Sequence, residues 1–233
     1  MAFNFKQFSV DDSGAAMKVG TDAVLFSAWV DCPDVKNVLD VGAGSGIIAL
    51  ALAQRTEDIN TKIIAVEVES EAAKQCEVNF KNSKWNERLS VLNMNFSNLT
   101  GPFDLIVSNP PFFKGSLSSK NEARTLARQG SDLNYISLIR FAAKNLSKPH
   151  GRLAFISNIV NENDIIFEAE LCSLKLKRKC YVFTNVNSKP KRIMWEFTFA
   201  NSEICKCESL VIRDGDCYTQ QYIDRVKNFY LQL

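Results

Sequence analysis

Short apolar runs, each followed by a turn or an amphipathic segment, recur along most of this chain of 233 residues. Continuous apolar runs indicate buried strands, and apolar positions three and four apart indicate helices. The expected strands cover 37–41, 62–66, 89–93, 103–108, 151–157, 179–183 and 193–199. Helices are expected at 47–53 and 70–84. Strand, turn and helix thus alternate in the first half of the chain, which favours an α/β fold.

The two ends of the chain have patterns of their own. Three phenylalanines among polar residues suggest a short aromatic edge strand: Phe3, Phe5 and Phe8. A buried helix is expected over 22–30, with Thr21 and Asp22 as candidate N-caps. Near the other end, four side chains recur at helical spacing and are expected to pack against the core: Tyr218, Tyr222, Val226 and Phe229.

Composition agrees with a single soluble domain, since a chain of this size buries roughly three quarters of the surface that its unfolded form exposes. The seven cysteines are scattered and include no C-x-x-C pair, so we expect neither a disulfide framework nor a zinc site, and no metal. No stretch approaches the roughly 20 apolar residues of a membrane span, and no basic and apolar leader opens the chain. The cytoplasm is the expected location.

The most informative motif is Asn109-Pro110-Pro111-Phe112, directly after the apolar run 103–108. A strand that ends there leaves the Asn109 amide and the Pro110 carbonyl beyond its carboxyl end, where both can accept hydrogen bonds. With the ring of Phe112 beside them, these acceptors make a slot for a flat heterocycle that carries an exocyclic NH2 group. The alternative is that the two prolines merely end a buried strand.

A glycine-rich turn joins the expected strand 37–41 to the helix 47–53. Asp40 precedes Gly42, Gly44 and Gly46, so the spacing is D-x-G-x-G-x-G. The dinucleotide fingerprint G-x-G-x-x-G would require a third glycine where Ile47 stands. Backbone N–H groups and the helix N-terminus favour a carboxylate, whereas Asp40 can accept from an ammonium group. An amino acid attached to a nucleoside therefore fits this turn better than a pyrophosphate.

The next two strand ends carry further polar candidates. Glu67 follows 62–66, at the position where an acid binds two ribose hydroxyls in open α/β folds. Asn95 and Phe96 follow 89–93 and offer an amide and a ring to an adenine. A solvated acid and a turn asparagine are the plainer interpretations of Glu67 and Asn95 taken singly. Their order along the chain favours one shared ligand.

The segment before the first strand could close over that ligand. Lys18 could meet its carboxylate, with Thr21 and Asp22 nearby, although a capped helix with a solvated lysine is an equal alternative. His150, the only histidine, lies before the strand at 151–157 and is expected to be a turn residue and not a catalytic base.

Net charge is only +2, so composition alone requires no polyanionic partner, but the distribution of charge is uneven. Seven basic residues and no acid occur between Lys175 and Arg192. Three of them lie in the expected turn between the last two strands and are candidates for RNA phosphates: Lys189, Lys191 and Arg192. A second candidate element follows the Asn-Pro-Pro-Phe motif and contributes Phe113, Arg124 and Arg128. Solvated strand ends and structural ion pairs are the alternatives.

Through VLDVGAGSGI, AVEVES and SNPPFF in that order, the chain resembles the class I S-adenosylmethionine-dependent methyltransferases. The resemblance implies a Rossmann-like α/β fold, with a seven-stranded, mostly parallel sheet, an antiparallel C-terminal hairpin and helices on both faces. It also implies S-adenosylmethionine as cofactor, held by Asp40, Gly42, Ala43, Gly44, Gly46, Glu67, Val68, Asn95, Phe96, Asn109, Lys18, Thr21 and Asp22. Asn109, Pro110, Pro111 and Phe112 are then the catalytic residues.

Further matches at both ends, including KVGTDA and the tyrosines after residue 217, resemble the bacterial methyltransferases that modify adenine N6 of adenosine 37 in a valine tRNA. This resemblance covers nearly the whole chain. It implies one methyltransferase domain over 1–233, with a cap segment at 1–35 and the catalytic core at 36–233. A tRNA is the expected partner, with no membrane, and a monomer is the expected state.

The proposed chemistry needs no general base, because an aromatic amine that donates hydrogen bonds to two fixed acceptors is favoured in the tetrahedral form that attacks a sulfonium methyl group. Two other classes remain open. The same acceptors suit guanine N2 of ribosomal RNA or a protein glutamine. A nicotinamide-dependent oxidoreductase or a non-catalytic nucleotide-binding module is a more distant possibility.

Overall fold

The computed structural model describes residues 2–15, 18–56, 61–111, 133–201 and 205–232. Its main feature is a sheet with the strand order β11-β10-β8-β9-β7-β6-β3-β4-β5. The strands of this sheet are β3 (Asn37–Val41), β4 (Lys62–Glu67), β5 (Leu89–Asn93), β6 (Leu105–Ser108), β7 (Arg152–Asn158), β8 (Lys175–Asn185), β9 (Arg192–Thr198), β10 (Lys206–Asp214) and β11 (Cys217–Tyr218). A separate antiparallel pair joins β1 (Ala2–Asn4) to β2 (Ser9–Asp11).

Seven of the nine strands form the expected pattern. β5, β4, β3, β6 and β7 are parallel neighbours, and β9 lies antiparallel between β7 and β8. The prediction of a mostly parallel α/β sheet is therefore confirmed. Two further strands extend it, since β10 pairs parallel with β8 and β11 antiparallel with β10. The basic turn at 186–191 consequently joins β8 to β9 and not the last two strands.

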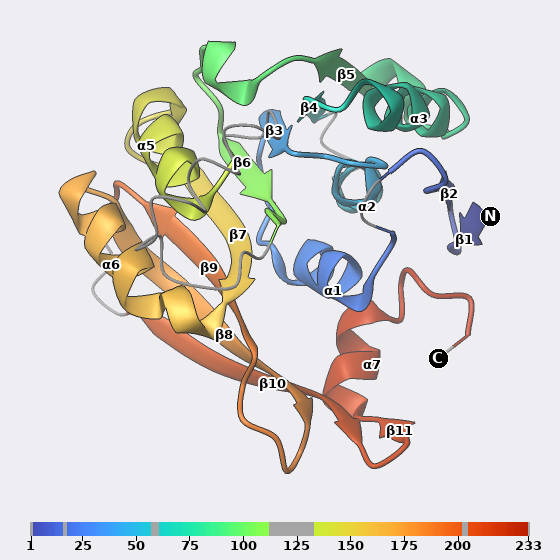
Figure 1. Cartoon of the computed structure of the whole chain (residues 1–233), viewed down its shortest axis with the longest axis vertical. Coiled ribbons are helices and arrows are strands. Elements are labelled where there is room, and N and C mark those ends of the chain that lie inside the picture. Colours follow the sequence, from blue (N-terminus) through green and yellow to red (C-terminus); the bar gives the residue numbers. More distant parts are fainter. Residues whose placement is uncertain (1, 16–17, 57–60, 112–132, 202–204, 233) are drawn as a thin grey trace, which may run out of the picture.

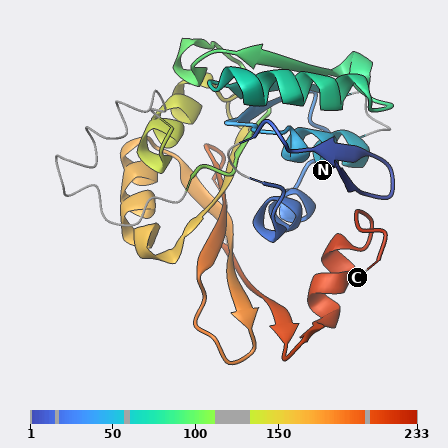
Figure 2. The same ribbon diagram turned by 45° about the vertical axis from the view of Figure 1, so that its right-hand side comes forward.

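Helices cover both faces of the sheet (Figures 1 and 2). One face carries α1 (Thr21–Trp29), α2 (Ile47–Arg55), α3 (Ser70–Lys81) and α7 (Gln220–Val226). The other carries α5 (Tyr135–Asn145) and α6 (Glu162–Leu171), which the apolar pattern did not predict. Within the described residues, no helix is long and apolar enough to cross a membrane.

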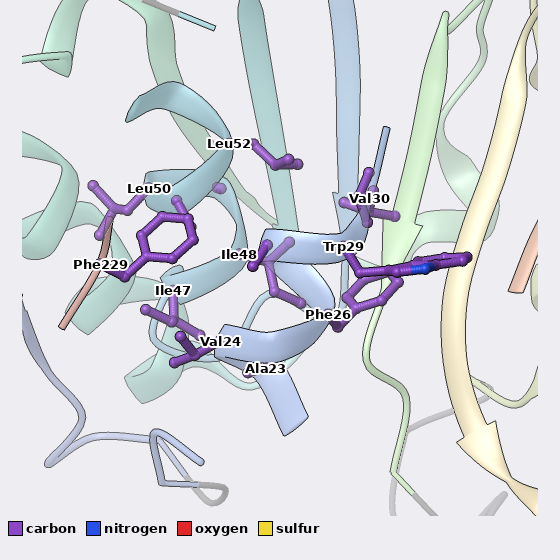
Figure 3. Close-up of a cluster of buried hydrophobic side chains, with 14 of the residues drawn as sticks. Ala23, Val24, Phe26, Trp29, Val30, Ile47, Ile48, Leu50, Leu52 and Phe229 are labelled. Atoms are coloured by element: carbon purple, nitrogen blue, oxygen red, sulfur yellow. The ribbon is translucent and has the colours of Figure 1, made fainter. Parts of the chain in front are cut away.

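The core on the α1 side is continuous from α1 to α2 and on to the C-terminal segment. Phe26 of α1 and Leu50 of α2 are fully buried, Val24 of α1 lies beside Ile47 of α2, and the Phe229 ring lies beside Leu50 (Figure 3). Tyr222 and Val226 of α7 are also buried, and Tyr218 packs against the same cluster. The prediction that this stripe is core packing is confirmed.

The start of α1 differs from the prediction. Its N-cap is Gly20, with no side-chain capping bond, so the expectation that Thr21 or Asp22 is the cap is wrong. Both residues lie in the first turn of the helix. The Asp22 carboxylate accepts from Arg192 Nε at 3.2 Å, and the ion pair directs it toward β9.

The parallel arrangement brings the functional candidates to one edge. The carboxyl ends of β3, β4, β5, β6 and β7 meet there, so the glycine turn, Glu67, the segment after Asn93 and Asn109 leave the sheet on the same side. β7 and β8 are both antiparallel to β9, so they run in the same direction. The turn after β8 therefore lies at this edge too.

Candidate active site at the carboxyl edge of the sheet

The glycine turn between β3 and α2 is packed on one side and open on another. Gly46 has φ +83°, and a Cβ there would lie 2.6 Å from Phe80 Cε1 and 2.7 Å from Cys76 Sγ of α3. At Gly44, with φ +54°, a Cβ would meet no atom within 4 Å. The turn therefore rests on α3 and leaves room for a ligand at Gly44, as a cofactor cradle requires.

Asp40 lies beneath this turn and is fully buried. Its Oδ2 accepts from Ala49 N at 3.1 Å, whereas Oδ1 is buried with no hydrogen-bond partner among the described residues. Burial raises the pKa of Asp40 to about 7, the bond from Ala49 opposes that rise, and the nearby Glu67 adds to it. An ammonium group of a ligand at Oδ1 would donate the hydrogen bond that this oxygen lacks. It would also place a positive charge beside the buried carboxylate.

Glu67 at the end of β4 is 8 % exposed and contacts the same turn through a hydrogen bond. Its Oε2 accepts from Gly44 N at 2.8 Å and its Oε1 from Glu69 N at 3.0 Å. Carboxylate oxygens accept more than one hydrogen bond, so both can still take ribose hydroxyls. The next residue, Val68, is 39 % exposed and presents an apolar surface at this edge.

The two candidates after β5 differ from each other. Asn95 caps the short helix Phe96–Asn98, and its Oδ1 accepts from Ser97 N at 2.9 Å. The Phe96 ring is 6 % exposed and packs edge-on against Phe141 of α5, 5.2 Å between ring centres. The exposed apolar surface near the expected adenine position is thus Val68 and not the face of Phe96.

Asn109 lies beside the glycine turn, as predicted from the strand order. Val41 of β3 pairs with Ser108 of β6, and Ser108 Oγ donates to Val41 O at 2.8 Å. Gly42 and Asn109 therefore leave their strands side by side. Asn109 Oδ1 is buried and has no hydrogen-bond partner among the described residues, and Pro110 next to it is buried.

A buried acceptor without a donor costs free energy, roughly 1–3 kcal/mol, unless a ligand supplies one. Ser108, which fixes this geometry, was not predicted as a functional residue. The sequence feature that could have identified Ser108 is a hydroxyl group at the end of the apolar run Leu105-Ile106-Val107.

The cap segment and the basic turn are also at this edge. Lys18 Nζ donates to the carbonyls of Asp12 and Ser13 at 2.7 and 3.3 Å, and its side chain is 61 % exposed. Thr21 is exposed, as are Lys189 and Lys191. The ion pair of Asp22 with Arg192 joins a predicted cofactor residue to a predicted RNA residue. Phe112, Phe113, Arg124 and Arg128 lie outside the described residues.

Comparisons with known proteins agree with this geometry. The family model of the methyltransferase small domain matches residues 13–158. A tRNA1(Val) (adenine(37)-N6)-methyltransferase of Haemophilus influenzae is 38 % identical over 236 aligned positions, which cover 99 % of this chain and 98 % of the relative. The protein of that name from Phocaeicola vulgatus is 36 % identical, with the same two coverages.

Two solved structures show the same fold. A predicted O-methyltransferase from Agrobacterium tumefaciens has a TM-score of 0.65 at 18 % identity and covers 89 % of this chain and 96 % of its own. A methyltransferase from Pyrococcus furiosus has a TM-score of 0.55 at 19 % identity, with 81 % and 91 % covered. The chain thus belongs to the methyltransferase small domain family and to the family of the tRNA1(Val) (adenine(37)-N6)-methyltransferases.

Proposed function

We propose that this protein methylates N6 of adenosine 37, next to the anticodon, in a valine tRNA, with S-adenosylmethionine as the methyl donor. Relatives of that name are 36 % and 38 % identical over nearly the full length of this chain, which supports the substrate. The observation that carries the chemistry is the buried, unpaired Asn109 Oδ1 beside the glycine turn, which has no partner among the described residues. An acceptor held there suits a planar amino group.

The residues around the turn fit the cofactor, which when bound supplies an electrophilic methyl group on a sulfonium sulfur. The methionine part would be held by Asp40, Gly42, Ala43, Gly44 and Gly46. Glu67 would bind the ribose, and Val68, Asn95 and Phe96 would surround the adenine. Lys18, Thr21 and Asp22 of the cap segment would border the site. The open space at Gly44 and the unpaired Asp40 Oδ1 support this assignment.

Asn109 and Pro110 would act on the target amine. Hydrogen bonds from the amino group to Asn109 Oδ1 and to the Pro110 carbonyl favour a tetrahedral nitrogen, whose lone pair is then available for attack. Both acceptors also stabilise the positive charge that grows on this nitrogen. The surplus proton leaves to water after transfer, so no side chain has to titrate. Pro111 restrains the backbone after the acceptors, and Phe112 would stack on the base.

RNA contacts are assigned to the basic turn after β8. Lys189 and Lys191 are exposed at the same edge as Asn109, where they can meet phosphates on either side of a flipped base. Phe113, Arg124 and Arg128 would add contacts from the segment after the motif. A base in an anticodon loop is already unpaired, which lowers the cost of moving it into the slot. The expected site of action is the cytoplasm.

Two experiments test the proposal. Nucleoside mass spectrometry of tRNA from a strain that lacks the gene should show the loss of N6-methyladenosine, and an unchanged level would refute the substrate. In vitro, Asn109→Ala should lower kcat by about 10² to 10³-fold, the range found when one fixed transition-state partner is removed. Its affinity for S-adenosylhomocysteine should fall far less than kcat, because the other predicted cofactor residues, including Asp40 and Glu67, remain in place. A near wild-type kcat would refute the role of Asn109.

A further inference from the structure

The side chain of Asn79 on α3 joins two segments that are far apart in sequence. It is 4 % exposed. Its Nδ2 donates to Ser45 O in the glycine turn and to Asp11 O in β2, both at 2.8 Å. Its Oδ1 accepts from Asp11 N at 3.0 Å. Both amide hydrogens are therefore used, one on the cofactor turn and the other on the N-terminal segment, which lies next to α3 (Figure 1).

The surface of α3 around Asn79 holds both segments at close range. A Cβ on Gly46 would lie within 2.7 Å of Cys76 Sγ, one turn before Asn79. On the other side, a Cβ on Gly14 would lie 3.0 Å from Glu71 O. The helix is thus closely packed against both the glycine turn and the N-terminal segment, and Asn79 hydrogen-bonds to both.

From Asp11 the connection continues to the start of α1. Asp12 Oδ2 accepts from Val19 N at 2.9 Å, and Asp12 O accepts from Lys18 Nζ at 2.7 Å. Val19 precedes Gly20, the N-cap of α1. One side chain thus links the glycine turn to the whole stretch that carries the predicted cap residues.

We infer that Asn79 is a positioning residue for the cofactor, which holds the Ser45 carbonyl of the glycine turn and the backbone of β2 in one fixed frame. The inference rests on the proposed function, because it takes the turn to be the methionine cradle. Asn79 itself touches no reacting atom. Its loss should therefore weaken cofactor binding and leave the transfer step nearly intact.

The experiment compares Asn79→Leu, which removes all three hydrogen bonds, with wild type. The KM for S-adenosylmethionine and the Kd for S-adenosylhomocysteine should rise roughly tenfold or more, as expected for the loss of buried hydrogen bonds. At saturating cofactor, kcat should fall less than about threefold, and the KM for RNA should not change. Asn79→Asp retains the acceptor for Asp11 N but has no N–H for Ser45 O, so its cofactor affinity should be equally weak.

Asn145 on α5 provides the matched control. It is 8 % exposed, its Nδ2 donates to Phe141 O at 2.9 Å and its Oδ1 accepts from Gly101 N at 2.7 Å, at the opposite edge of the sheet. Asn145→Leu should lower the Tm about as much as Asn79→Leu and leave the KM for S-adenosylmethionine unchanged. Equal cofactor affinities in the two variants would overturn the role of Asn79 and leave the proposed function standing.

A measurement on the unmodified protein keeps the test valid if Asn79→Leu does not fold. Addition of S-adenosylhomocysteine should slow amide hydrogen exchange at 9–15 together with 41–47, because Asn79 couples these segments. Protection confined to 41–47 would overturn the inference. Wild-type protein that binds no S-adenosylhomocysteine would overturn the proposed function and the inference together.

Discussion

Replacement of Asp40 by Asn should stabilise the protein at pH 8 and abolish strong cofactor binding. Asp40 is fully buried, and only Oδ2 has a hydrogen-bond donor among the described residues. The variant keeps an oxygen to accept from Ala49 N, and it removes a charge that the folded state holds at a cost. The same charge is what an ammonium group of the cofactor would meet.

The magnitude follows from the pKa. Burial raises the pKa of Asp40 from 3.8 to about 7, which corresponds to about 4 kcal/mol against the charged form above pH 7. The amide NH2 that the substitution introduces takes the place of Oδ1 and has no acceptor, which costs roughly 1–3 kcal/mol. The net gain in the free energy of unfolding at pH 8 should therefore be about 1–3 kcal/mol.

The sign of the pH dependence separates this account from a simple packing effect. Below about pH 4, Asp40 is protonated in both folded and unfolded chains and costs nothing. Between about pH 4 and pH 7 the unfolded chain ionises first, so this residue makes the folded state progressively less stable. The advantage of Asp40→Asn should accordingly grow from pH 5 to pH 8.

Urea unfolding at both pH values, with and without S-adenosylhomocysteine, measures the effect. The ligand should raise the midpoint of wild type at pH 8 far more than that of Asp40→Asn. The reasoning would be refuted if the variant were destabilised equally at both pH values, since the burial cost would then be absent. Retention of wild-type cofactor affinity by the variant would remove the role of the charge in binding.

Two further predictions address the RNA edge and the buried charges of the sheet. Charge reversal of Lys189 and Lys191 should raise the KM for RNA and make it less salt-dependent, while cofactor affinity stays constant; an unchanged KM would argue against phosphate contacts. Glu196 is fully buried and forms ion pairs with Arg178, Lys177 and Arg152 at 2.8, 3.1 and 3.5 Å. Glu196→Gln should cost about 3 kcal/mol in urea unfolding, because Arg178 loses its carboxylate partner while Arg152 and Lys177 are left to share Asp31. Cofactor KM should not change, and a loss below about 1 kcal/mol would contradict that account.

The features that were predicted correctly depend on short stretches of sequence. β3, the glycine turn and the start of α2 are encoded within one continuous segment, 37–53, so the pattern specifies them without reference to the rest of the chain. The position of Asn109 beside that segment followed from the rule that parallel strands end at a common edge.

Charged strands were predicted poorly. β8 begins at Lys175, four residues before the predicted start, within a run of cations that looks solvated. A bulge between Leu176 and Arg178 aligns Lys177 and Arg178 with Glu196, so the charges are neutralised by a residue of another strand. The apolar pattern cannot reveal this, because the acid that makes burial possible lies about twenty residues further on.

The contacts that hold the site together were the least predictable, because each pairs an ordinary residue with a distant backbone group or charge. Asn79 has the sequence surroundings of a plain helical asparagine, and only the fold brings Ser45 and Asp11 to its amide. Asp22 and Arg192 were assigned to different ligands, and the ion pair between them was not predicted. Motifs therefore indicate which groups meet the ligand, while the fixed spacing between those groups depends on long-range partners. Loss of such a partner should appear mainly in KM, whereas loss of a motif residue such as Asn109 should appear mainly in kcat.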